Sequence, residues 1–351
     1  MESLKKFTEL LVKKENLVSE QVRSCIDLLV SDKVGLTDKE CFLSALAQKG
    51  ETVQEITSFI NYFRELARDP GLEKFAGNAI DLCGTGGDKA GSFNISTFVS
   101  FLVASSGTPV IKHGNRSISS KCGSADLIEA VGIPLEMENE KLQGSMNELN
   151  YAFLFAPSFH TAFKNIAPVR KSLANKGVIT IFNILGPMIN PARPSFQLLG
   201  VYSRDLVSKI ANALNLSGNK GGFVVHGCLK NQSGVTGVDE LTSSGENIVC
   251  GIGRNSNQNE PSWNAEEFGL SYEPFEDLKG GDLKRNLSLM NALLNEEAPP
   301  GLTNSILMNA SVAFLAAGRS KDLKEGVEIA TKLLRDGVVK NWLLRANTLF
   351  N

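Results

Sequence analysis

The feature that most limits how this chain can fold is the glycine-rich segment Asp81 to Thr97, DLCGTGGDKAGSFNIST. A short apolar run, Ala79 to Cys83, precedes the glycines, and a second apolar run, Phe98 to Ala104, follows them. This order predicts a strand, a tight loop and a helix that starts with hydroxyl side chains. Glycines let the backbone come close to a phosphate, and the free N–H groups of a helix start point at it. The segment therefore predicts a phosphate-binding turn.

The turn alone does not identify a ligand. It lacks the Lys-Ser/Thr pair that follows the glycines of a P-loop, and it lacks the G-x-G-x-x-G spacing of a dinucleotide fold. A two-glycine turn between a strand and a helix is as often structural as functional, and Asp88 could be an ordinary turn residue. The rest of the chain has to decide between these interpretations.

Length and composition narrow the class of protein. At 351 residues the chain favours two lobes, or one domain with a small satellite. The 36 basic and 38 acidic residues nearly balance, which gives no general reason to bind nucleic acid. No run approaches the roughly 18 apolar residues of a membrane span, and the amphipathic start lacks a signal-peptide core. The six scattered cysteines are typical of free thiols in a reducing cytoplasm, and the three histidines lack metal-ligand spacing.

The first seventy residues predict helices alone. Thr37-x-x-Glu40 and Thr52-x-x-Glu55 both fit the capping box, in which a hydroxyl and an acid satisfy the first free N–H groups of a helix. The second helix is expected to stop at Pro70-Gly71. Its predicted apolar face consists of Val53, Ile56, Ile60, Phe63 and Ala67.

From Ala79 onward, short apolar runs alternate with helical patterns, which predicts a largely parallel sheet covered on both faces. The expected strands are Ile80 to Cys83, Pro109 to Lys112, Ala152 to Phe155, Gln197 to Val201 and Phe223 to Val225. The expected helices are Ser124 to Val131, Arg204 to Leu214, Asp282 to Leu294, Ser305 to Ala317 and Leu323 to Arg335. The run His160 to Ala174 is also predicted helical with a break at Pro168, and we expect the chain to revisit the helical lobe there. The polar stretch Asn255 to Pro261 is expected to be a mobile loop.

A second polar block, Lys112 to Ser124 (KHGNRSISSKCGS), follows the next predicted strand. Ligands of parallel sheets bind at the carboxyl ends of strands, so this block and the glycine turn should lie side by side. Lys112, Arg116 and Lys121 supply positive charge, and four serines supply hydroxyl donors. This composition predicts a flexible clamp for a polyphosphate, with a solvated basic loop as the alternative.

The third block is the adjacent pair Asp239 and Glu240, after a glycine-bounded turn that follows the Phe223 to Val225 strand. Such pairs are usually solvated surface residues. Beside phosphate loops, however, oxygen ligands without histidine or thiolate suit Mg²⁺, which typically takes one or two carboxylates and then substrate phosphates. Two further candidates bracket the helical segment: Arg170 could bind a substrate carboxylate through both of its terminal nitrogens, and His160 lies at the other end. A lone Arg or His on a helix is more often a surface or helix-end residue.

Taken together, these blocks resemble the anthranilate phosphoribosyltransferase family, which joins anthranilate to phosphoribosyl pyrophosphate (PRPP) in tryptophan biosynthesis. The resemblance extends in order over most of the chain and is far more specific than any one motif. It rests on GTGGD at Gly84 to Asp88, FNIST at Phe93 to Thr97, KHGNRSISSKCGSAD at Lys112 to Asp126, HTAFKNIAPVR at His160 to Arg170, IFNILGPMINPA at Ile181 to Ala192 and VDEL at Val238 to Leu241.

The resemblance implies an α/β fold in which a small all-helical N-terminal domain is hinged to a larger domain with a mainly parallel central sheet flanked by helices. It places the helical domain at residues 1–72, with a contribution from about 161–191, and the phosphoribosyl-binding domain at 73–160 and 192–351. It also implies a cytoplasmic homodimer formed through the helical domains. The implied cofactor is Mg²⁺, with two ions when PRPP is bound.

Matching motif positions also imply roles for individual residues. No catalytic residue is certain; Lys112, Asn115 and Arg170 are expected to act by positioning and electrostatics. Ser96, Asp239 and Glu240 are expected to hold the metal, and Gly84, Asn115, His160, Arg170 and Gly186 to meet anthranilate. The residues expected to contact PRPP are Gly84, Gly87, Asp88, Ser92, Asn94, Ile95, Ser96, Thr97, Lys112, His113, Gly114, Asn115, Arg116, Ser117, Ile118, Ser119, Ser120 and Ser124.

The departures from the family pattern lie mainly on the acceptor side. Thr161 and Phe163 stand where the family usually has proline and methionine, and Ile179 stands where an arginine is common. The stretch between Arg170 and Ile181 is about three residues longer than usual. Cys122 replaces a frequent serine in the clamp. Recognition of anthranilate is therefore less well predicted than binding of PRPP.

The implied reaction displaces pyrophosphate from ribose C1 by the anthranilate amine. Catalysis would come from positioning and from neutralising the charge that builds on the leaving group, with water excluded by domain closure. An aromatic amine is already unprotonated at neutral pH, so no histidine base is expected. Two alternatives share the expected architecture: a pyrimidine-nucleoside phosphorylase, and a non-catalytic relative that binds nucleic acid. The FNIST and Asp-Glu blocks disfavour the first, and the near-neutral charge disfavours the second.

Overall fold

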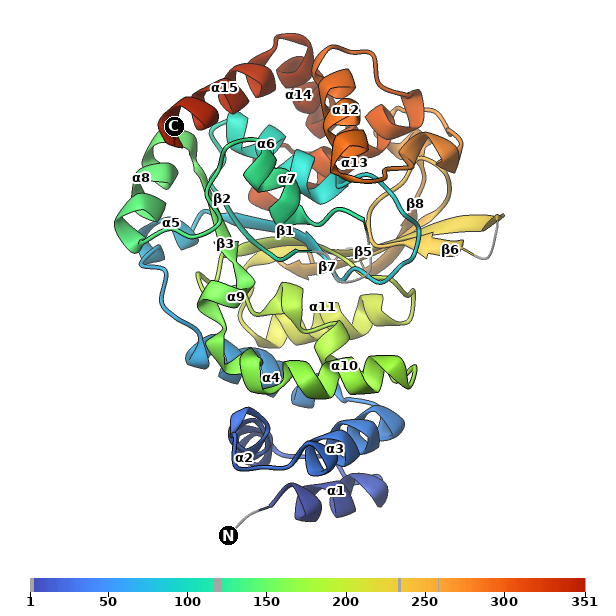
Figure 1. The fold of residues 1–351 in the computed structure, drawn as a ribbon. Coiled ribbons are helices and arrows are strands. Elements are labelled where there is room, and N and C mark those ends of the chain that lie inside the picture. Colours follow the sequence, from blue (N-terminus) through green and yellow to red (C-terminus); the bar gives the residue numbers. More distant parts are fainter. Residues whose placement is uncertain (1–2, 117–120, 233–234, 258, 351) are drawn as a thin grey trace.

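The computed structural model describes residues 3–350 except 117–120, 233–234 and 258, and the side chains of 230–236 and 258–261 are not described. A helical part lies at the N-terminal end of the molecule, and a sheet with helices on both faces makes up the rest (Figure 1). The fold is thus α/β, as expected from the sequence.

The helical part begins with α1 (Leu4–Val12), α2 (Ser19–Val30), α3 (Leu36–Lys49) and α4 (Val53–Leu66). Each helix buries one apolar face, and α4 buries Ile56, Phe59, Ile60 and Phe63. In the part of the chain that the structure describes, no strand precedes Ile80, as predicted. The helix α4 ends at Leu66, four residues before the predicted stop at Pro70.

One of the two predicted capping boxes is confirmed and the other is wrong. The Thr52 hydroxyl accepts the N–H of Glu55, and the Glu55 carboxylate accepts the N–H of Thr52. Thr37, however, lies inside α3, which begins at Leu36 with Gly35 at the N-cap. The Glu40 carboxylate instead pairs with Lys176, 2.5 Å away.

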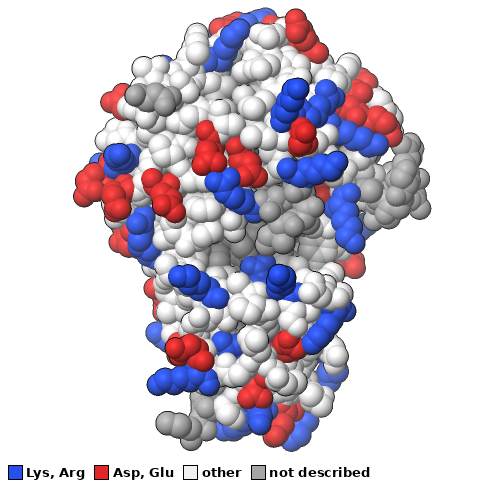
Figure 2. All heavy atoms as spheres, viewed as in Figure 1, with Lys and Arg blue, Asp and Glu red and all other residues white. Residues whose placement is uncertain are grey.

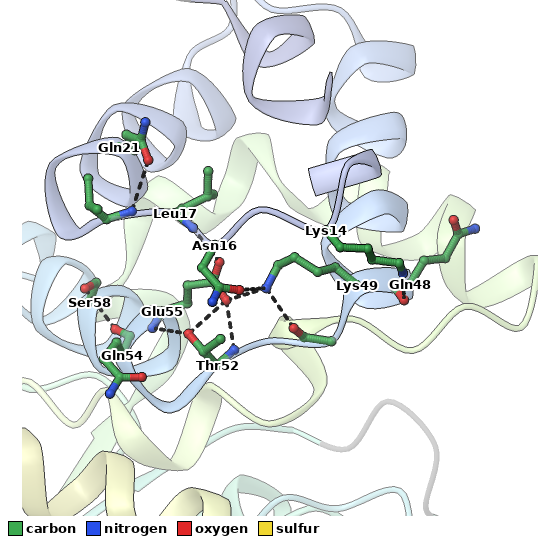
Figure 3. A network of polar contacts seen from close by, with 12 residues as sticks. Lys14, Asn16, Leu17, Gln21, Gln48, Lys49, Thr52, Gln54, Glu55 and Ser58 are labelled. Carbon is green, nitrogen blue, oxygen red and sulfur yellow. Dashed lines mark hydrogen bonds and ion pairs between the residues drawn. The ribbon is translucent and has the colours of Figure 1, made fainter. Parts of the chain in front are cut away.

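A buried ion pair joins the helices of this part (Figure 3). Lys49 lies 2.8 Å from the Glu55 carboxylate, and both side chains are almost completely buried. The second Glu55 oxygen accepts the N–H of Leu17, which begins the turn into α2, and Lys49 also donates to Asn16. Because every oxygen of the carboxylate has a donor, the pair fixes how the α1–α2 turn sits on α4.

The sheet has the strand order β3-β2-β1-β4-β5-β7-β8, with β6 paired to β5. Strands β1 to β5 pair in parallel, and β5 to β8 pair antiparallel. The chain therefore builds outward from β1 to β3 in one direction and then from β4 in the other. The bounds are β1 (Ile80–Gly84), β2 (Val110–Gly114), β3 (Tyr151–Phe155), β4 (Phe196–Gly200), β5 (Gly221–Gln232), β6 (Val235–Val238), β7 (Asn247–Gly253) and β8 (Asn259–Trp263).

The two faces of the sheet carry different cores because strand side chains alternate. On one face Leu82, Leu198 and Phe223 pack with α6 and α13; on the other, Cys83, Leu199 and Val224 belong to a cluster that continues through α11 into the helical part. The helices around the sheet are α5 (Glu73–Ala76), α6 (Ile95–Ser105), α7 (Ser124–Ala130), α8 (Asn139–Leu149), α11 (Leu206–Leu216), α12 (Leu283–Leu294), α13 (Pro300–Ala317), α14 (Leu323–Arg335) and α15 (Val338–Phe350). Short 3₁₀ turns η4 (Ala265–Phe268) and η5 (Phe275–Leu278) precede α12.

Between β3 and β4 the chain runs along the helical part. It forms α9 (Ala156–Phe159), η1 (Thr161–Asn165), α10 (Ala167–Asn175), η2 (Ile181–Asn183) and η3 (Gly186–Met188). The predicted break at Pro168 is confirmed, since this proline lies in the first turn of α10. The α10 helix packs on α3.

Two further local predictions are wrong. The stretch Asn255 to Pro261 is not a loop throughout, because β8 begins at Asn259 and pairs with β7. The strand predicted to end at Val225 continues to Gln232 and turns back as β6, so Asp239 follows β6. The second half of β5 and the strand β8 are rich in polar residues, so a prediction based on apolar runs missed them.

Candidate active site

The glycine turn and the Asp239 carboxylate are in direct contact. The Gly86 N–H donates to Asp239 Oδ2 over 2.6 Å, and the Thr85 N–H donates to the Gly200 carbonyl over 2.9 Å. A Cβ on Gly84 would lie 2.3 Å from the same Asp239 oxygen, so only glycine fits. Gly86 and Gly87 adopt φ of +66° and +82°, which favours glycine at both positions. The turn is thereby folded around the carboxylate.

The start of α6 holds the second carboxylate. The Ser96 N–H donates to Glu240 over 3.1 Å, which places an anion at the positive end of the helix. Lys112, in the middle of β2 and fully buried, donates to the Ser96 hydroxyl over 3.3 Å and to the Leu82 carbonyl. The predicted metal residues Ser96, Asp239 and Glu240 thus come together from α6 and the turn after β6.

Burial changes the charge state of these groups. Desolvation raises the pKa of Asp239 well above its usual value, and the charges of Asp88 and Glu240 add to the shift. Desolvation also raises the pKa of Glu240 to about 7, opposed by the positive charge of Lys112. The pKa of Lys112 is lowered by desolvation. Several carboxyls held close together away from water are stabilised by a cation.

The donor set fits Mg²⁺ and no softer metal. Among the described residues, no three His, Cys, Asp or Glu side chains form a cluster that could by itself hold a metal ion. Two carboxylates and a serine hydroxyl are hard oxygen donors, and Mg²⁺ usually completes its shell with water and substrate phosphates. The site therefore suits a metal that arrives with a phosphorylated ligand.

The described part of the clamp lies beside this cluster. Asn94, just before α6, donates to the Cys122 carbonyl over 3.3 Å, and the Ser124 hydroxyl donates to the Asn115 carbonyl over 3.1 Å. Gly114 permits this approach, because a Cβ there would lie 2.5 Å from the Ser124 hydroxyl. Ser117, Ile118, Ser119 and Ser120 lie outside the described residues.

Arg116 does not point at the cluster. Its guanidinium pairs with Asp126 and Glu129 of α7, at 2.6 and 2.9 Å. The pairs are solvent-exposed and therefore weak, so an incoming anion could compete for this arginine.

The remaining residues predicted for PRPP lie around the start of α6. Asp88 accepts the Ala90 N–H over 3.1 Å, and Ser92 pairs with Lys279 in an isolated bridge. The Ile95 side chain belongs to the core, so only its main chain is open to a ligand. Thr97 is buried, and its hydroxyl has no hydrogen-bond partner among the described residues.

Three of the predicted acceptor-side residues, His160, Arg170 and Gly186, lie in a second, mostly aromatic group that also contains His113, a residue predicted for PRPP. The His113 and His160 rings lie 5.1 Å apart, and His113 Nδ1 lies 3.2 Å from the Gly186 carbonyl. Burial lowers the pKa of His113 to about 3 and that of His160 to about 4, so both rings are neutral at pH 7. Arg170 donates to the Phe182 carbonyl over 3.2 Å, and desolvation lowers its pKa.

Of the three acceptor-side residues that depart from the family pattern, one belongs to this group. The Phe163 ring lies 4.7 Å from Phe63 of α4 and 5.7 Å from His160. Thr161 and Ile179 are exposed instead.

Sequence reasoning missed a buried polar pair under the site. Asp81 on β1 accepts a 2.9 Å hydrogen bond from Asn190, and both side chains are buried. The aspartate in an apolar strand could have indicated a buried polar contact. Nothing in the sequence, however, shows which side chain forms a hydrogen bond with it.

The charge pattern of the surface agrees with the near-neutral composition. On the face seen in Figure 2, acidic and basic side chains are interspersed over the upper part, and basic side chains border the constriction above the helical part. None of the described helices is long and apolar enough to cross a bilayer.

Comparison with known proteins gives a consistent result. Residues 76–340 match the family model "Glycosyl transferase family, a/b domain". The anthranilate phosphoribosyltransferase of Solibacter usitatus is 39% identical over 332 residues, which cover 94% of both chains. This chain belongs to the anthranilate phosphoribosyltransferase family. The enzyme of Persephonella marina is 36% identical, again over 94% of both chains.

Solved structures of the family have the same fold. The anthranilate phosphoribosyltransferase of Thermus thermophilus is 36% identical, covers 98% of both chains and has a TM-score of 0.85. The enzyme of Saccharomyces cerevisiae, solved in complex with PRPP and Mg, is 23% identical with a TM-score of 0.82 over 97% of this chain and 96% of that one. The predictions of family and fold class are confirmed.

Proposed function

We propose that this chain transfers the phosphoribosyl group of PRPP to the amine of anthranilate, releasing pyrophosphate, as a step of tryptophan biosynthesis. The observation that carries the proposal is the contact of Gly86 with Asp239 and of Ser96 with Glu240. These contacts bring a phosphate-binding turn, a helix start and two hard-metal ligands to one edge of the sheet. The names of the curated relatives support the same reaction.

For PRPP we propose the glycine turn from Gly84 to Asp88, the start of α6 and the clamp after β2 as the binding surface. The N–H groups of the turn and of the helix start that are not bonded to Asp239, Glu240 or the Gly200 carbonyl can donate to phosphate oxygens, and Lys112 adds a buried positive charge. We assign Ser96, Asp239 and Glu240 as the residues that would hold Mg²⁺, with two ions in the PRPP complex. Bound there, the metal supplies the positive charge that offsets the charge of the leaving pyrophosphate. The Saccharomyces cerevisiae structure with PRPP and Mg supports this cofactor.

For anthranilate we propose the group around His160, Arg170, Gly186, Gly84 and Asn115. Arg170 can bind both carboxylate oxygens, and the buried rings around His160 exclude water from the reacting amine. The neutral histidines are weak bases at these pKa values, and an aromatic amine needs no deprotonation before it attacks. Catalysis then depends on orientation and on charge stabilisation.

We further propose the domain division 1–72 with 161–191 against 73–160 with 192–351, a homodimer formed through the helical domain, and a cytoplasmic location. Lys39 of α3 donates to the Asn165 carbonyl over 3.3 Å, and Asn165 donates to the Val30 carbonyl over 2.7 Å. These contacts support grouping the returning segment with the helices.

The test is a fluorescence assay that follows anthranilate loss. We expect turnover when PRPP and Mg²⁺ are both present and none when either is omitted. Thymidine phosphorolysis, with phosphate in place of PRPP, serves as the control for the phosphorylase alternative. Absence of anthranilate turnover in the complete mixture would refute the proposal.

A further inference from the structure

The main chain of residues 186–190 is bonded to side chains on both sides of the proposed acceptor group. His113 Nδ1 lies 3.2 Å from the Gly186 carbonyl, and the His160 ring donates to the Ile189 carbonyl. Gln197 of β4 donates to the Pro187 carbonyl over 2.7 Å. The segment 186–190 therefore sets the orientation of both histidine rings relative to the sheet.

Asn190 fastens the end of this segment. Its Nδ2 donates to Asp81 Oδ2 and to the Ile111 carbonyl, both over 2.9 Å, and its Oδ1 accepts the Ala192 N–H over 3.0 Å. The amide cannot be flipped without losing the Ile111 and Ala192 bonds, so its two hydrogens must meet acceptors. Asn190 is buried, so water does not replace a lost partner.

Asp81 of β1 is the side chain that accepts one of the two Asn190 amide hydrogens. One of its oxygens accepts the Asn190 amide, and the other accepts the His113 N–H over 3.2 Å. Both partners are donors, so the position needs a side chain that accepts at both oxygens, which an amide cannot do. The charges that face Asp81 are Lys112 from β2 and Arg64 from α4. Asp81 thus joins the end of β2 to the segment that carries Gly186.

We propose that Asn190 and Asp81 are positioning residues for the acceptor substrate. Neither touches a substrate in this assignment. They act through Gly186 and His160, by holding segment 186–190 against the ends of β1 and β2. This inference rests on the proposed acceptor site and predicts that their loss affects anthranilate more than PRPP.

The test compares steady-state kinetics of Asn190→Ala with those of the wild-type enzyme, varying each substrate in turn. We expect the KM for anthranilate to rise about ten-fold or more, while the KM for PRPP changes less than about three-fold. Asp81→Asn should weaken anthranilate use in the same direction. Because the two residues act as one pair, the double variant should lose much less than the product of the single losses.

Ser145→Ala is the matched control. The Ser145 hydroxyl is also buried and donates to the Tyr151 carbonyl over 2.6 Å, at the opposite end of β3 from the site. It loses one buried hydrogen bond but should leave both KM values unchanged. Thermal unfolding of all variants separates a loss of folded protein from a loss of substrate binding.

Equal changes in both KM values, or fully multiplicative losses in the double variant, would overturn the inference. The proposed function would still stand in that case, as long as the wild-type enzyme turns over. An inactive wild-type enzyme would instead refute the proposed function. A crystal structure of Asn190→Ala tests the pair independently of activity. An unchanged 186–190 segment, with both histidine rings in place, would overturn the inference.

Discussion

At the residue scale, Asp239 and Glu240 define what the site can do. Their carboxylates are held by main-chain N–H groups of the glycine turn and of α6, and Asp239 is buried while Glu240 is half-buried. An acidic pair held in this way is not a typical solvated surface pair, and its oxygen atoms suit a divalent cation.

We expect the double variant Asp239→Ala/Glu240→Ala to lose Mg²⁺-dependent turnover and to keep its fold. Removing both groups deletes the proposed metal ligands without leaving one buried carboxylate unpaired. The rate is measured against Mg²⁺ concentration, and the fold by circular dichroism. The matched control is Glu296→Ala/Glu297→Ala, an exposed adjacent pair after α12. Unchanged turnover in the first variant would refute the metal assignment.

The same carboxyls predict how metal use depends on pH. Because the pKa of Glu240 is raised to about 7, the ionised fraction falls roughly ten-fold between pH 8 and pH 6. Metal binding requires the ionised form, so affinity is full above the raised pKa and is lost as the pH falls through it. We expect the Mg²⁺ concentration for half-maximal rate to rise about ten-fold from pH 8 to pH 6. A value independent of pH would contradict this prediction.

At the element scale, the start of α4 depends on one cap. Thr52 accepts the Glu55 N–H, and Glu55 also holds Lys49. We expect Thr52→Ala to lower the free energy of unfolding by about 1 kcal/mol in urea. Thr37→Ala is the control, because Thr37 is exposed inside α3 and caps nothing, so its effect should stay within about 0.5 kcal/mol. Equal losses in the two variants would show that the Thr52 cap contributes nothing special.

The end of β4 leaves no room beside Asp239. A Cβ on Gly200 would lie 1.5 Å from the Asp239 carbonyl oxygen, so Gly200→Ala must displace the carboxylate turn. We expect it to reduce kcat by more than ten-fold. Gly144→Ala in α8 meets no atom within 4 Å and should instead stabilise its helix by about 0.5–1 kcal/mol without affecting the rate. Full activity of Gly200→Ala would mean that the turn tolerates displacement.

At the scale of the whole molecule, the proposed dimer predicts a mass. Three large apolar side chains of the helical part are exposed, Val12 at 69%, Val18 at 58% and Leu36 at 53%. We expect light scattering to give about twice 37.9 kDa. Val18→Asp/Leu36→Asp should shift it toward the monomer, whereas Leu344→Asp, on α15, should not. A monomeric wild-type mass would refute the dimer.

The sequence by itself determined the order of elements around the site. The glycine run and the block after Lys112 each follow a parallel strand, and parallel strands bring their carboxyl ends to one edge. The Asp-Glu pair reaches the same edge differently, because it follows β6, which pairs antiparallel with β5. Local chemistry was sufficient there, because glycine spacing, hydroxyl caps and apolar runs act over a few residues. Prediction from local chemistry failed at β6 and β8. These two strands depend on pairing with β5 and β7 rather than on a run of apolar residues.

Only the tertiary structure decided which buried polar groups meet. Asp81 and Asn190 form a hydrogen bond although they lie 109 positions apart in the sequence. Arg116 pairs with Asp126 of α7 rather than pointing at the glycine turn. A hydrogen bond between distant residues depends on the packing of whole elements, because burial removes water as the alternative partner. Short-range sequence patterns do not determine how whole elements pack, so these contacts could not be predicted from the sequence.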